Sequence, residues 1–551
     1  MTVRDATARP VRVLNFNVGI LGHVDSGKTA FAKAISKVAG TAAFDKHPES
    51  RRRGITIDLG FSCFTIPITE QMTVRDKELI NFDIIQVTLV DCPGHSSLFR
   101  TVIGCSQIVD MVFLVVDIQK GIQPQTADCI VLANIMRPSK MLIVLNKVDT
   151  LPPEDRSQLI ATTERRIRRA LARTTFRNVP MVPMSVVPPD SNSIDRFMDV
   201  FTMNIYVPDR TAAADDPFMF HFDHCFSLRG KGMVVTGTVI SGKCNQGQTV
   251  EIPMVQQVRK VKTIESFHRA VSSIGPGDRA GLCLSQANAC NLDRGLLCEP
   301  GALKMSYGAI VTLRRVPYYK FCIASRLQFQ ICIGYETIPA KCCFFACEPG
   351  KCIQEDKVLT FKKEGDYAWI HEVHKSSEEA ENACHLFAVL RFTRGIYCTL
   401  GCNYLGTKLE IEPSNSVCRI AFYGRTLHLF EDPKFRGTKI NWLKVYKPRV
   451  RRGVVERIKD DKYATVRDMF RKGCNIEPYL GCNVTLSTGE VGRLESSFGQ
   501  AGKVTVFLPG GAKQSTIKTV AKQNKNNEDD LVRVEMRFKR LVFCDDAKIF
   551  Q

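Results

Sequence analysis

The stretch Gly22–Thr29 constrains the fold more than any other part of the chain. It reads Gly-His-Val-Asp-Ser-Gly-Lys-Thr, which has the spacing G-x-x-x-x-G-K-[ST]. An apolar run, Val11–Leu21, precedes it, and the composition of Ala30–Val38 behind it suits a helix. A strand, a glycine-rich turn and a helix in this order place backbone N–H groups around phosphates at a helix N-terminus. The order therefore predicts an α/β domain that binds a nucleotide.

Several residues of this loop are the expected phosphate contacts. Lys28 would reach the β- and γ-phosphates, and the Thr29 hydroxyl would be a ligand of Mg²⁺. A single motif of this kind also occurs by chance, so the interpretation depends on further nucleotide signatures downstream. The predicted nucleotide-binding residues of the loop are Gly22, Asp25, Ser26, Gly27, Lys28 and Thr29.

Two signatures of a phosphate-sensing switch follow. The first, Arg-Gly-Ile-Thr, ends at Thr56, which we expect to bind Mg²⁺ and sense the γ-phosphate. The second, Asp-Cys-Pro-Gly-His, directly follows the apolar strand Ile84–Val90. Asp91 would hold Mg²⁺ through water, and the Gly94 N–H would contact the γ-phosphate. His95 is the predicted catalytic residue, because it stands where other GTPases carry the glutamine that positions the attacking water.

The fourth signature reads the base. Asn146, Lys147 and Asp149 follow the predicted strand Met141–Leu145. A carboxylate at Asp149 accepts hydrogen bonds from the ring N–H and the exocyclic amine of guanine, a donor pair that adenine lacks. Ser185 follows the next predicted strand and is the candidate for the loop beside the base, although Ser-Val departs from the usual motif there. Four signatures in order predict a GTPase that uses GTP/GDP and Mg²⁺.

Length and composition limit the remaining possibilities. At 551 residues the chain is too long for one hydrophobic core, and 44% hydrophobic residues are typical of folded domains. No apolar run approaches the length of a membrane span, and residues 1–10 carry no apolar stretch of signal-peptide length. We therefore expect no membrane association and no export. A monomer in the cytoplasm is expected.

The cysteines also favour a reducing compartment. The 22 cysteines are scattered through apolar stretches and lack the spacing of a small disulfide scaffold. The one dense cluster is Cys342, Cys343, Cys347 and Cys352, with Phe344 and Phe345 inside it. It lacks a paired C-x-x-C spacing, so buried strand cysteines are favoured, and a zinc site stays open as the alternative.

The charge of the chain is uneven. The formal net charge is +20, and residues 441–551 alone hold 22 Lys and Arg against 13 Asp and Glu. A basic C-terminal part beside a GTPase predicts a polyanionic partner, most simply RNA. A solvated basic surface without a ligand is the alternative. The run Lys444–Gly453 is interpreted as a basic hinge, and a nuclear pool of the protein is possible if it acts as an import signal.

The pattern of apolar residues changes along the chain. Residues 11–205 alternate strands with helical segments, as in a doubly wound sheet. From Phe218 onward short strands are separated by glycine turns, which predicts β-barrels. Three polar stretches are expected outside the cores: a linker at Pro208–Pro217, a surface insertion at Ile353–Ala383 and a loop at Lys518–Asp530. The predicted fold class is multidomain α/β plus β, and the predicted domains are a doubly wound P-loop GTPase domain at 1–210, β-barrels at 217–303 and 304–440, and a basic, strand-rich fourth domain at 445–551.

Several stretches together identify a family resemblance. The chain resembles the eukaryotic selenocysteine-specific elongation factors, which are translational GTPases of the elongation factor Tu type, and the similarity covers essentially the whole chain. The stretches that carry it are Gly22–Thr29, Thr41–Lys46, Arg53–Phe61, Phe222–Gly232, Gly277–Arg279, Leu486–Glu490 and Phe498–Gly502. The strand-rich end of the chain fits the eukaryotic and archaeal type.

The resemblance implies a function and partners. Such a protein delivers selenocysteinyl-tRNA to the ribosome at recoded UGA codons, and GTP hydrolysis triggers release of the tRNA. A separate binding protein connects it to the selenocysteine-insertion RNA element. Two alternatives stay open: another tRNA-carrying translational GTPase, such as a general elongation factor or the γ subunit of an initiation factor, and a non-catalytic RNA-binding scaffold.

The resemblance also implies an aminoacyl pocket lined by Asp223, His224 and Arg279. A selenol is more acidic than a thiol, so the cargo side chain is an anion at neutral pH, whereas serine is neutral. A guanidinium and an imidazole would form charge-assisted contacts with that anion, and these contacts strengthen as water leaves the pocket. Asp223 would hold the two cations in place.

Overall fold

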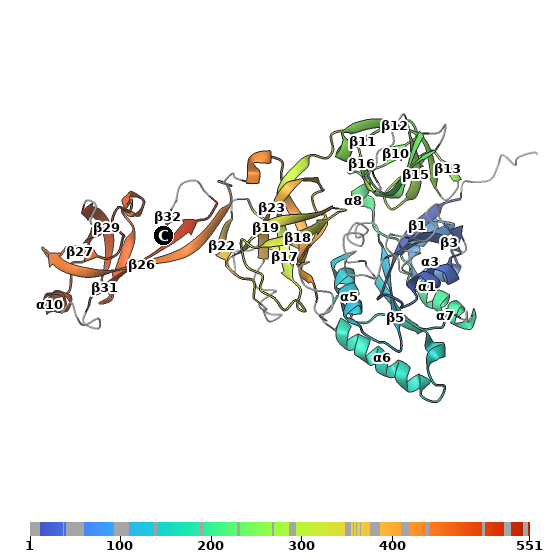
Figure 1. Ribbon diagram of the computed structural model, residues 1–551, viewed down its shortest axis with the longest axis horizontal. Coiled ribbons are helices and arrows are strands. Elements are labelled where there is room, and N and C mark those ends of the chain that lie inside the picture. Colours follow the sequence, from blue (N-terminus) through green and yellow to red (C-terminus); the bar gives the residue numbers. More distant parts are fainter. Residues whose placement is uncertain are drawn as a thin grey trace, which may run out of the picture. The chain divides into compact units, whose positions relative to one another are not determined.

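The computed structural model of the chain describes two compact units (Figure 1). One unit contains Met1–Cys342 and Val389–Arg436, and the other contains Cys343–Ala388 and Gly437–Gln551. The described residues are 11–36, 38–39, 60–92, 109–136, 138, 140–172, 174–187, 191–228, 232–266, 269–285, 292, 294–334, 336–347, 354–355, 358–359, 361–363, 365–374, 386–408, 418–436, 440–498, 502–522, 531–543 and 549–551.

The N-terminal domain is built on a seven-stranded sheet of order β2-β3-β4-β1-β5-β6-β7. Strands β4, β1, β5, β6 and β7 run parallel, whereas β2 and β3 pair antiparallel at one edge. The strands are β1 (Val13–Leu21), β2 (Val38–Ala39), β3 (Gly60–Pro67), β4 (Ile84–Asp91), β5 (Met111–Asp117), β6 (Lys140–Asn146) and β7 (Met181–Pro183). The predicted α/β class is confirmed.

Helices cover this sheet, which explains why the interior strand β5 is buried along its whole length. Phe31 of α1 and two rings of α7, Phe197 and Phe201, pack edge-on against Phe113 of β5, with centroids 5.1–5.9 Å from it. The helices are α1 (Lys28–Ile35), α3 (Glu70–Arg75), α5 (Pro124–Met136), α6 (Arg156–Leu171), α7 (Ser191–Thr202) and α8 (Thr211–Ala214), with short 3-10 turns η1 (Lys77–Asn81) and η3 (Val148–Thr150). The predicted linker Pro208–Pro217 thus contains a helical turn.

The first barrel is a closed ring of six strands in the order β11-β16-β8-β9-β15-β12, because β11 also pairs with β12. Its strands are β8 (Met219–Leu228), β9 (Gly232–Ser241), β11 (Thr249–Ile252), β12 (Gln257–Ser266), β15 (Arg279–Leu284) and β16 (Gly295–Cys298), with β13 (Arg269–Val271) beside β12 and a small pair of β10 (Cys244–Asn245) with β14 (Ser273–Ile274). Alternate residues of these strands, including Phe220, Val235 and Leu282, fill the interior.

The second barrel has the strand order β18-β24-β25-β17-β23-β19, closed by pairing of β18 with β19. Its strands are β17 (Met305–Arg315), β18 (Gln328–Ile333), β19 (Glu336–Cys347), β23 (Leu386–Tyr397), β24 (Asn403–Thr407) and β25 (Ile420–Phe430). Cys342 and Cys343 are buried strand residues of β19, as predicted. Cys347 is disulfide-bonded, so the expectation of reduced thiols is wrong at this position. Cys352 lies outside the described residues.

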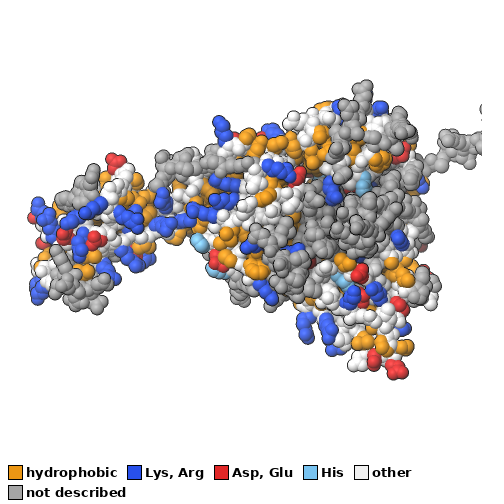
Figure 2. Space-filling model, in the orientation of Figure 1, with side chains coloured by type: hydrophobic (Ala, Val, Ile, Leu, Met, Phe, Trp, Pro, Cys, Tyr) orange, Lys and Arg blue, Asp and Glu red, His pale blue; other side chains and the backbone are white. Residues whose placement is uncertain are grey.

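The C-terminal region contains a third closed ring, of order β26-β27-β30-β29-β28-β31, in which β26 also pairs with β31. Its elements are β26 (Lys444–Lys459), β27 (Tyr463–Arg467), β28 (Asn483–Leu486), β29 (Val491–Phe498), β30 (Lys503–Phe507), α10 (Gln514–Lys522), β31 (Arg533–Leu541) and β32 (Ile549–Phe550). Its interior is mainly aliphatic, with Val455, Val466 and Val504 fully buried, and it also contains Phe470, Tyr479 and Phe538. Lys and Arg side chains spread over the outside of this region (Figure 2).

Three predicted polar segments are wrong in part. Lys444–Gly453 is not a hinge, because it forms the first ten residues of β26 and pairs with β31 from Tyr446 to Val454. The expected insertion Ile353–Ala383 contains β22 (Asp366–Ile370), whose Tyr367 is buried against Phe345 and Phe387. The expected loop after Lys518 begins as the last turn of α10. Charged side chains indicate that a segment is in contact with water, but such a segment can still form a strand or a helix.

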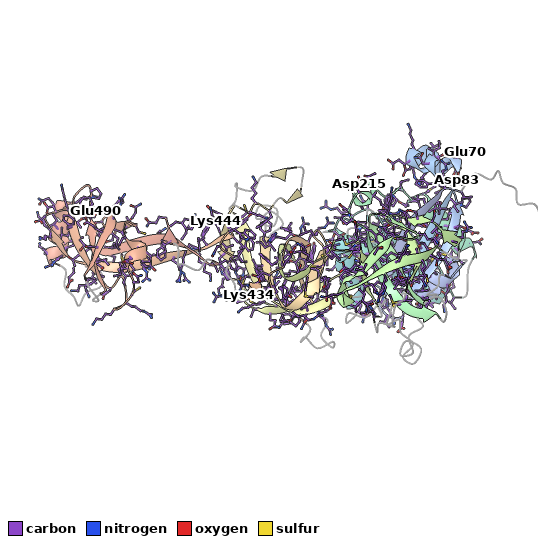
Figure 3. All side chains as sticks on the ribbon, turned by 90° about the horizontal axis from the view of Figure 1, so that it is seen from above. Glu70, Asp83, Asp215, Lys434, Lys444 and Glu490 are labelled. Atoms are coloured by element: carbon purple, nitrogen blue, oxygen red, sulfur yellow. The ribbon has the colours of Figure 1, made fainter. Side chains whose placement is uncertain are left out.

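A buried carboxylate joins α10 to the C-terminal ring. Glu490, labelled in Figure 3, lies between β28 and β29 and is 7% exposed. It accepts hydrogen bonds from the hydroxyls of Thr488 and Thr516 and from the Lys513 N–H at 3.1 Å. Burial opposes ionisation, but these hydrogen bonds outweigh it and lower the pKa of Glu490 to about 2.

We predict that Glu490→Gln loosens α10. The amide has one oxygen in place of two and loses charge-assisted bonds that contribute about 1.5–3 kcal/mol each. Because the folded pKa is depressed from 4.5, the stabilisation is present above pH 4.5 and is lost as the pH falls towards 2. Hydrogen exchange at pH 6 should be about 10–100-fold faster for α10 amides than in the wild type. Glu495→Gln, an exposed position of β29, is the control; equal rates in wild type and Glu490→Gln would contradict the prediction.

Candidate functional site: the nucleotide loops and the first barrel

The predicted nucleotide contacts meet at one edge of the N-terminal sheet. Gly22 follows β1, Asp91 ends β4, Asn146 ends β6, and Ser185 lies two residues after β7. These strands run parallel, so their carboxyl ends share an edge. Ligands of open α/β sheets bind at this edge. The topology therefore brings together four motifs that are up to about 160 residues apart in the chain.

The phosphate loop holds its lysine close to its own backbone. Lys28 is 6% exposed, and its Nζ donates to the carbonyl oxygens of Gly22 at 3.1 Å and His23 at 2.8 Å. Burial and the nearby Lys28 charge lower the pKa of His23, which keeps that imidazole neutral. The lysine ammonium is therefore the cation that this loop offers to an anionic ligand.

Gly27 cannot carry a side chain in this loop. It has φ +91°, and a Cβ atom there would lie 2.3 Å from Nδ2 of Asn146. The Asn146 amide occupies that space because it donates to the Ser26 carbonyl at 2.9 Å. This hydrogen bond ties the phosphate loop to the base-reading motif, so the two parts of the nucleotide site are one structural element.

Thr29 and Asp91 form a pair of oxygen donors beside the loop. The Thr29 hydroxyl donates to Oδ2 of Asp91 at 2.6 Å, and Asp91 is 1% exposed. A hydroxyl and a buried carboxylate side by side suit a hard, oxygen-seeking cation such as Mg²⁺. The residues present fit the predicted metal, with Thr29 and Asp91 as the side chains that would hold it.

Two polar contacts shape the base-reading loop. Lys147 Nζ lies 2.8 Å from Oδ2 of the buried Asp117, which is an ion pair that the sequence did not predict. Burial opposes ionisation of Asp117, but hydrogen bonds from Lys147 and from the Lys120 and Gln119 N–H groups leave its pKa below the usual value. The Ser185 hydroxyl donates to Oδ1 of Asp149 at 2.6 Å. Ser185 therefore lies beside the carboxylate that is expected to read guanine.

The predicted switch residues cannot be placed in the same way. Thr56, Gly94 and His95 lie outside the described residues. In the sequence, Thr56 precedes β3, and Gly94 and His95 follow β4. β4 ends at Asp91, and β3 begins at Gly60, four residues after Thr56.

In the first barrel, Asp223 and Arg279 form a buried ion pair. Arg279 Nη1 lies 2.7 Å from Oδ2 of Asp223, and Nη2 lies 3.0 Å from Oδ1. Arg279 is 6% exposed and Asp223 is 5% exposed. Thr236 also donates to Asp223, at 3.4 Å. This two-point contact is the strong geometry for a guanidinium and a carboxylate.

A β-bulge explains how two consecutive residues enter this site. Along β8 and β9, Phe222 pairs with Gly237 and His224 pairs with Thr236, which leaves Asp223 as the extra residue. Successive side chains of a regular strand point to opposite faces, and a bulge breaks that alternation. Gly237 permits it, because a Cβ there would lie 2.0 Å from the His221 carbonyl oxygen.

The charge of the site differs from a simple cationic pocket. Asp223 neutralises the charge of Arg279, and His224 is the third ionisable side chain predicted for this site. Nε2 of His224 lies 3.9 Å from Oδ1 of Asp223 and has no hydrogen-bond partner among the described residues, although this atom is buried. Its side chain is 31% exposed, which leaves it the most accessible of the three.

One aromatic residue of this site was not predicted. Phe61 of β3 lies under the Arg279 guanidinium, with its ring centroid 3.3 Å from Cζ, and meets the His224 ring edge-on at 6.5 Å. Phe61 is 1% exposed. Phe61 ends the stretch Arg53–Phe61 that carries the family resemblance. No local sequence pattern indicates its contact with Arg279, which lies more than 200 positions away.

Family models match three parts of the chain. Residues 14–206 match the family model of the elongation factor Tu GTP binding domain. Residues 310–424 match the third domain of eukaryotic selenocysteine-specific elongation factors, and residues 441–548 match the eEFSec C-terminal RIFT domain.

Curated relatives carry the same description. The mouse selenocysteine-specific elongation factor is 35% identical over 586 residues, which cover 98% of this chain and 99% of the mouse protein. The protein of that name from Methanocaldococcus jannaschii is 33% identical over 355 residues, covering 64% of this chain and 71% of its own length.

Solved structures show the same fold. Translation elongation factor SelB from Methanococcus maripaludis, in complex with the GTP analogue GppNHp, matches with a TM-score of 0.67 at 22% identity and covers 97% of this chain and 100% of its own. The bacterial factor EF-Sec matches with a TM-score of 0.53 at 19% identity, over 74% of this chain and 58% of its own. The chain therefore belongs to the selenocysteine-specific elongation factors and is a translational GTPase.

Proposed function

We propose that the protein binds selenocysteinyl-tRNA while GTP is bound, delivers it to the ribosome at recoded UGA codons and releases it after hydrolysis. The observation that carries the proposal is the buried Arg279–Asp223 pair in one compact unit with the nucleotide loops. Beside this pair lies Nε2 of His224, which has no hydrogen-bond partner within the described part of the chain. The proposed site for a charged cargo in the barrel and the proposed phosphate site in the GTPase domain thus belong to the same compact unit.

The contacts of the phosphate loop support the roles that we propose for its residues in nucleotide binding. Lys28 would exchange its loop carbonyls for the β- and γ-phosphates, and the N–H groups of Gly22, Asp25, Ser26 and Gly27 would cradle them. Thr29 and Asp91, with Thr56, would hold Mg²⁺. When bound there, the metal offsets the charge that develops on the phosphate oxygens during hydrolysis.

Hydrolysis needs a positioned water. His95 is proposed to orient it for in-line attack on the γ-phosphate, while the Gly94 N–H contacts that phosphate. Turnover of the isolated protein should be slow, with the ribosome supplying the trigger. Loss of the γ-phosphate would relax the segments around Thr56 and Gly94 and so release the tRNA.

Cargo selection is proposed to depend on charge. A selenolate entering beside His224 would accept a hydrogen bond from Nε2, which has no hydrogen-bond partner among the described residues. Arg279 would contribute its positive field while Asp223 holds the guanidinium in place. The serine hydroxyl can accept the same hydrogen bond but carries no negative charge, so serine is bound more weakly.

Further partners are proposed to bind the C-terminal region. The exposed cations of β26 and β31, such as Arg449, Arg452 and Arg540, suit a polyanionic surface. A separate protein that binds the selenocysteine-insertion RNA element is proposed to dock on the C-terminal region. Among the described helices, none has the length and apolar character needed to cross a bilayer. A cytoplasmic protein with a nuclear pool, acting as a monomer, is proposed.

Asp149→Asn should change the base that the site accepts. An amide accepts one hydrogen bond from guanine and directs its own N–H towards the exocyclic amine, so two favourable contacts become one contact and one clash. Xanthine carries a carbonyl there and restores the match. We expect GDP affinity to fall about 100-fold or more, with xanthosine diphosphate preferred. Competition against a fluorescent nucleotide measures both; unchanged preference for GDP would contradict the base-reading role.

Arg279→Gln should remove cargo discrimination. Loss of a charged contact is expected to weaken selenocysteinyl-tRNA binding about 10–100-fold. Binding of seryl-tRNA to the GTP form should change less than threefold. Filter binding of both tRNAs gives the ratio, with Arg269→Gln, an exposed position of the same barrel, as the control. An equal loss for both tRNAs would mean that Arg279 is only structural, and equal affinities in the wild type would remove the cargo assignment.

His95→Ala should abolish most of the ribosome-stimulated hydrolysis. Loss of a group that positions the attacking water is expected to slow the reaction about 10²–10⁴-fold. GDP affinity should stay unchanged, because the residue contacts no part of the base or the loop phosphates in the proposed mechanism. Single-turnover hydrolysis with saturating ribosomes measures the rate. Identical rates in the two proteins would favour a scaffold over an enzyme.

A further inference from the structure

We propose that Phe61 couples the nucleotide site to the cargo pocket, by covering Arg279 to an extent that depends on the bound nucleotide. The inference rests on the proposed function and adds a residue to it. Phe61 is the second residue of β3. It belongs to the GTPase domain, yet its ring lies against the barrel residues that are expected to select the cargo.

The contact closes the site around Arg279. Asp223 occupies the outer edge of the guanidinium through two hydrogen bonds, and the Phe61 ring covers one of its faces at 3.3 Å. All three side chains are at most 6% exposed. The ring and Asp223 therefore limit the directions from which an anion can reach Arg279. The position of Phe61 controls how much of the guanidinium is available.

Strand β3 connects Phe61 to the nucleotide loops. Gly60 lies opposite Asp91 in the antiparallel register of β3 and β4, and Phe61 lies opposite Val90. Asp91 accepts the Thr29 hydroxyl at 2.6 Å. A change at the Thr29–Asp91 pair, where the metal is expected, thus acts on the residue next to Phe61. The sequence path is also short, because Thr56 precedes Phe61 by five positions.

The barrel turn that carries Arg279 is anchored elsewhere on the same domain. From β1, Asn15 donates to Asp278 at 2.6 Å and Asn17 donates to the Gly277 carbonyl at 3.0 Å. Arg210 donates to the Asn15 carbonyl at 2.9 Å and to Asp110 at 2.7 Å. The turn therefore keeps its place on β1.

This arrangement allows the overlap of Phe61 with Arg279 to change. The Arg279 turn is fixed on β1, at the middle of the sheet, whereas Phe61 is near the start of β3, next to the switch segment. A shift of the β3 start cannot carry the turn with it. It must change the overlap of the Phe61 ring with Arg279. The two sites then share a coupling free energy, which acts equally in both directions.

The first test compares two phenylalanines of β3. Phe61→Leu removes the ring over Arg279, whereas Phe64→Leu removes a buried ring of the same strand that packs on Phe201 in the GTPase core. Filter binding measures the affinity for selenocysteinyl-tRNA with a GTP analogue and with GDP. We expect the GTP-to-GDP affinity ratio to fall at least tenfold in Phe61→Leu and to stay within twofold of wild type in Phe64→Leu. A wild-type ratio in Phe61→Leu overturns the proposal.

The second test needs no cargo. Phe61→Trp places an indole against Arg279, and its emission is measured as the difference from the wild type, which carries Trp369 and Trp442. Exchange of GDP for a GTP analogue should shift the emission, and Arg279→Gln in the same chain should abolish the shift. Identical spectra in both nucleotide states, or a shift that persists without Arg279, overturn the coupling. Failure of tRNA discrimination in the wild type would instead overturn the proposed function, and leaves this spectroscopic result to decide the inference.

Discussion

The two-point ion pair between Arg279 and Asp223 is the interaction around which the first barrel and its neighbouring strand are arranged. Two charges taken out of water are costly, and they are tolerated only when the geometry is good and the remaining donors are satisfied. Three local features meet that need: a bulge that turns Asp223 inward, a glycine at 237 that makes room for the bulge, and the Phe61 ring that excludes water. The pair itself has no net charge, so Arg279 does not act as an isolated cation.

The nucleotide loops were accessible to sequence reasoning because each is local. A motif directly after a strand has its place fixed by the strand, and parallel strands bring their carboxyl ends to one edge. Thr29 and Asp91 therefore lie in contact, as do Ser185 and Asp149, although Ser185 stands in an atypical motif. The α/β domain was predicted from strands that alternate with helical segments, and the barrels were predicted from short strands separated by glycine turns.

What the sequence did not reveal depends on pairings between distant segments. The bulge at Asp223 is a register shift between two strands, and nothing in the residues of β8 alone announces it. The Phe61–Arg279 contact joins a sheet edge to a barrel turn. The same limit explains the mistaken hinge at Lys444–Gly453, where a basic composition concealed the hydrogen bonds that the segment makes with β31.

Strand β26 has a consequence for how the chain meets proteases. Its sixteen residues include seven lysines and arginines, which would form a dense set of trypsin sites in an open connector. Here the backbone from Tyr446 to Val454 is hydrogen-bonded to β31, and cleavage requires an extended, unpaired segment in the enzyme's cleft. The basic residues that we propose as a polyanion-binding surface are thereby displayed on a backbone that resists digestion, so charge density and durability are obtained from the same strand.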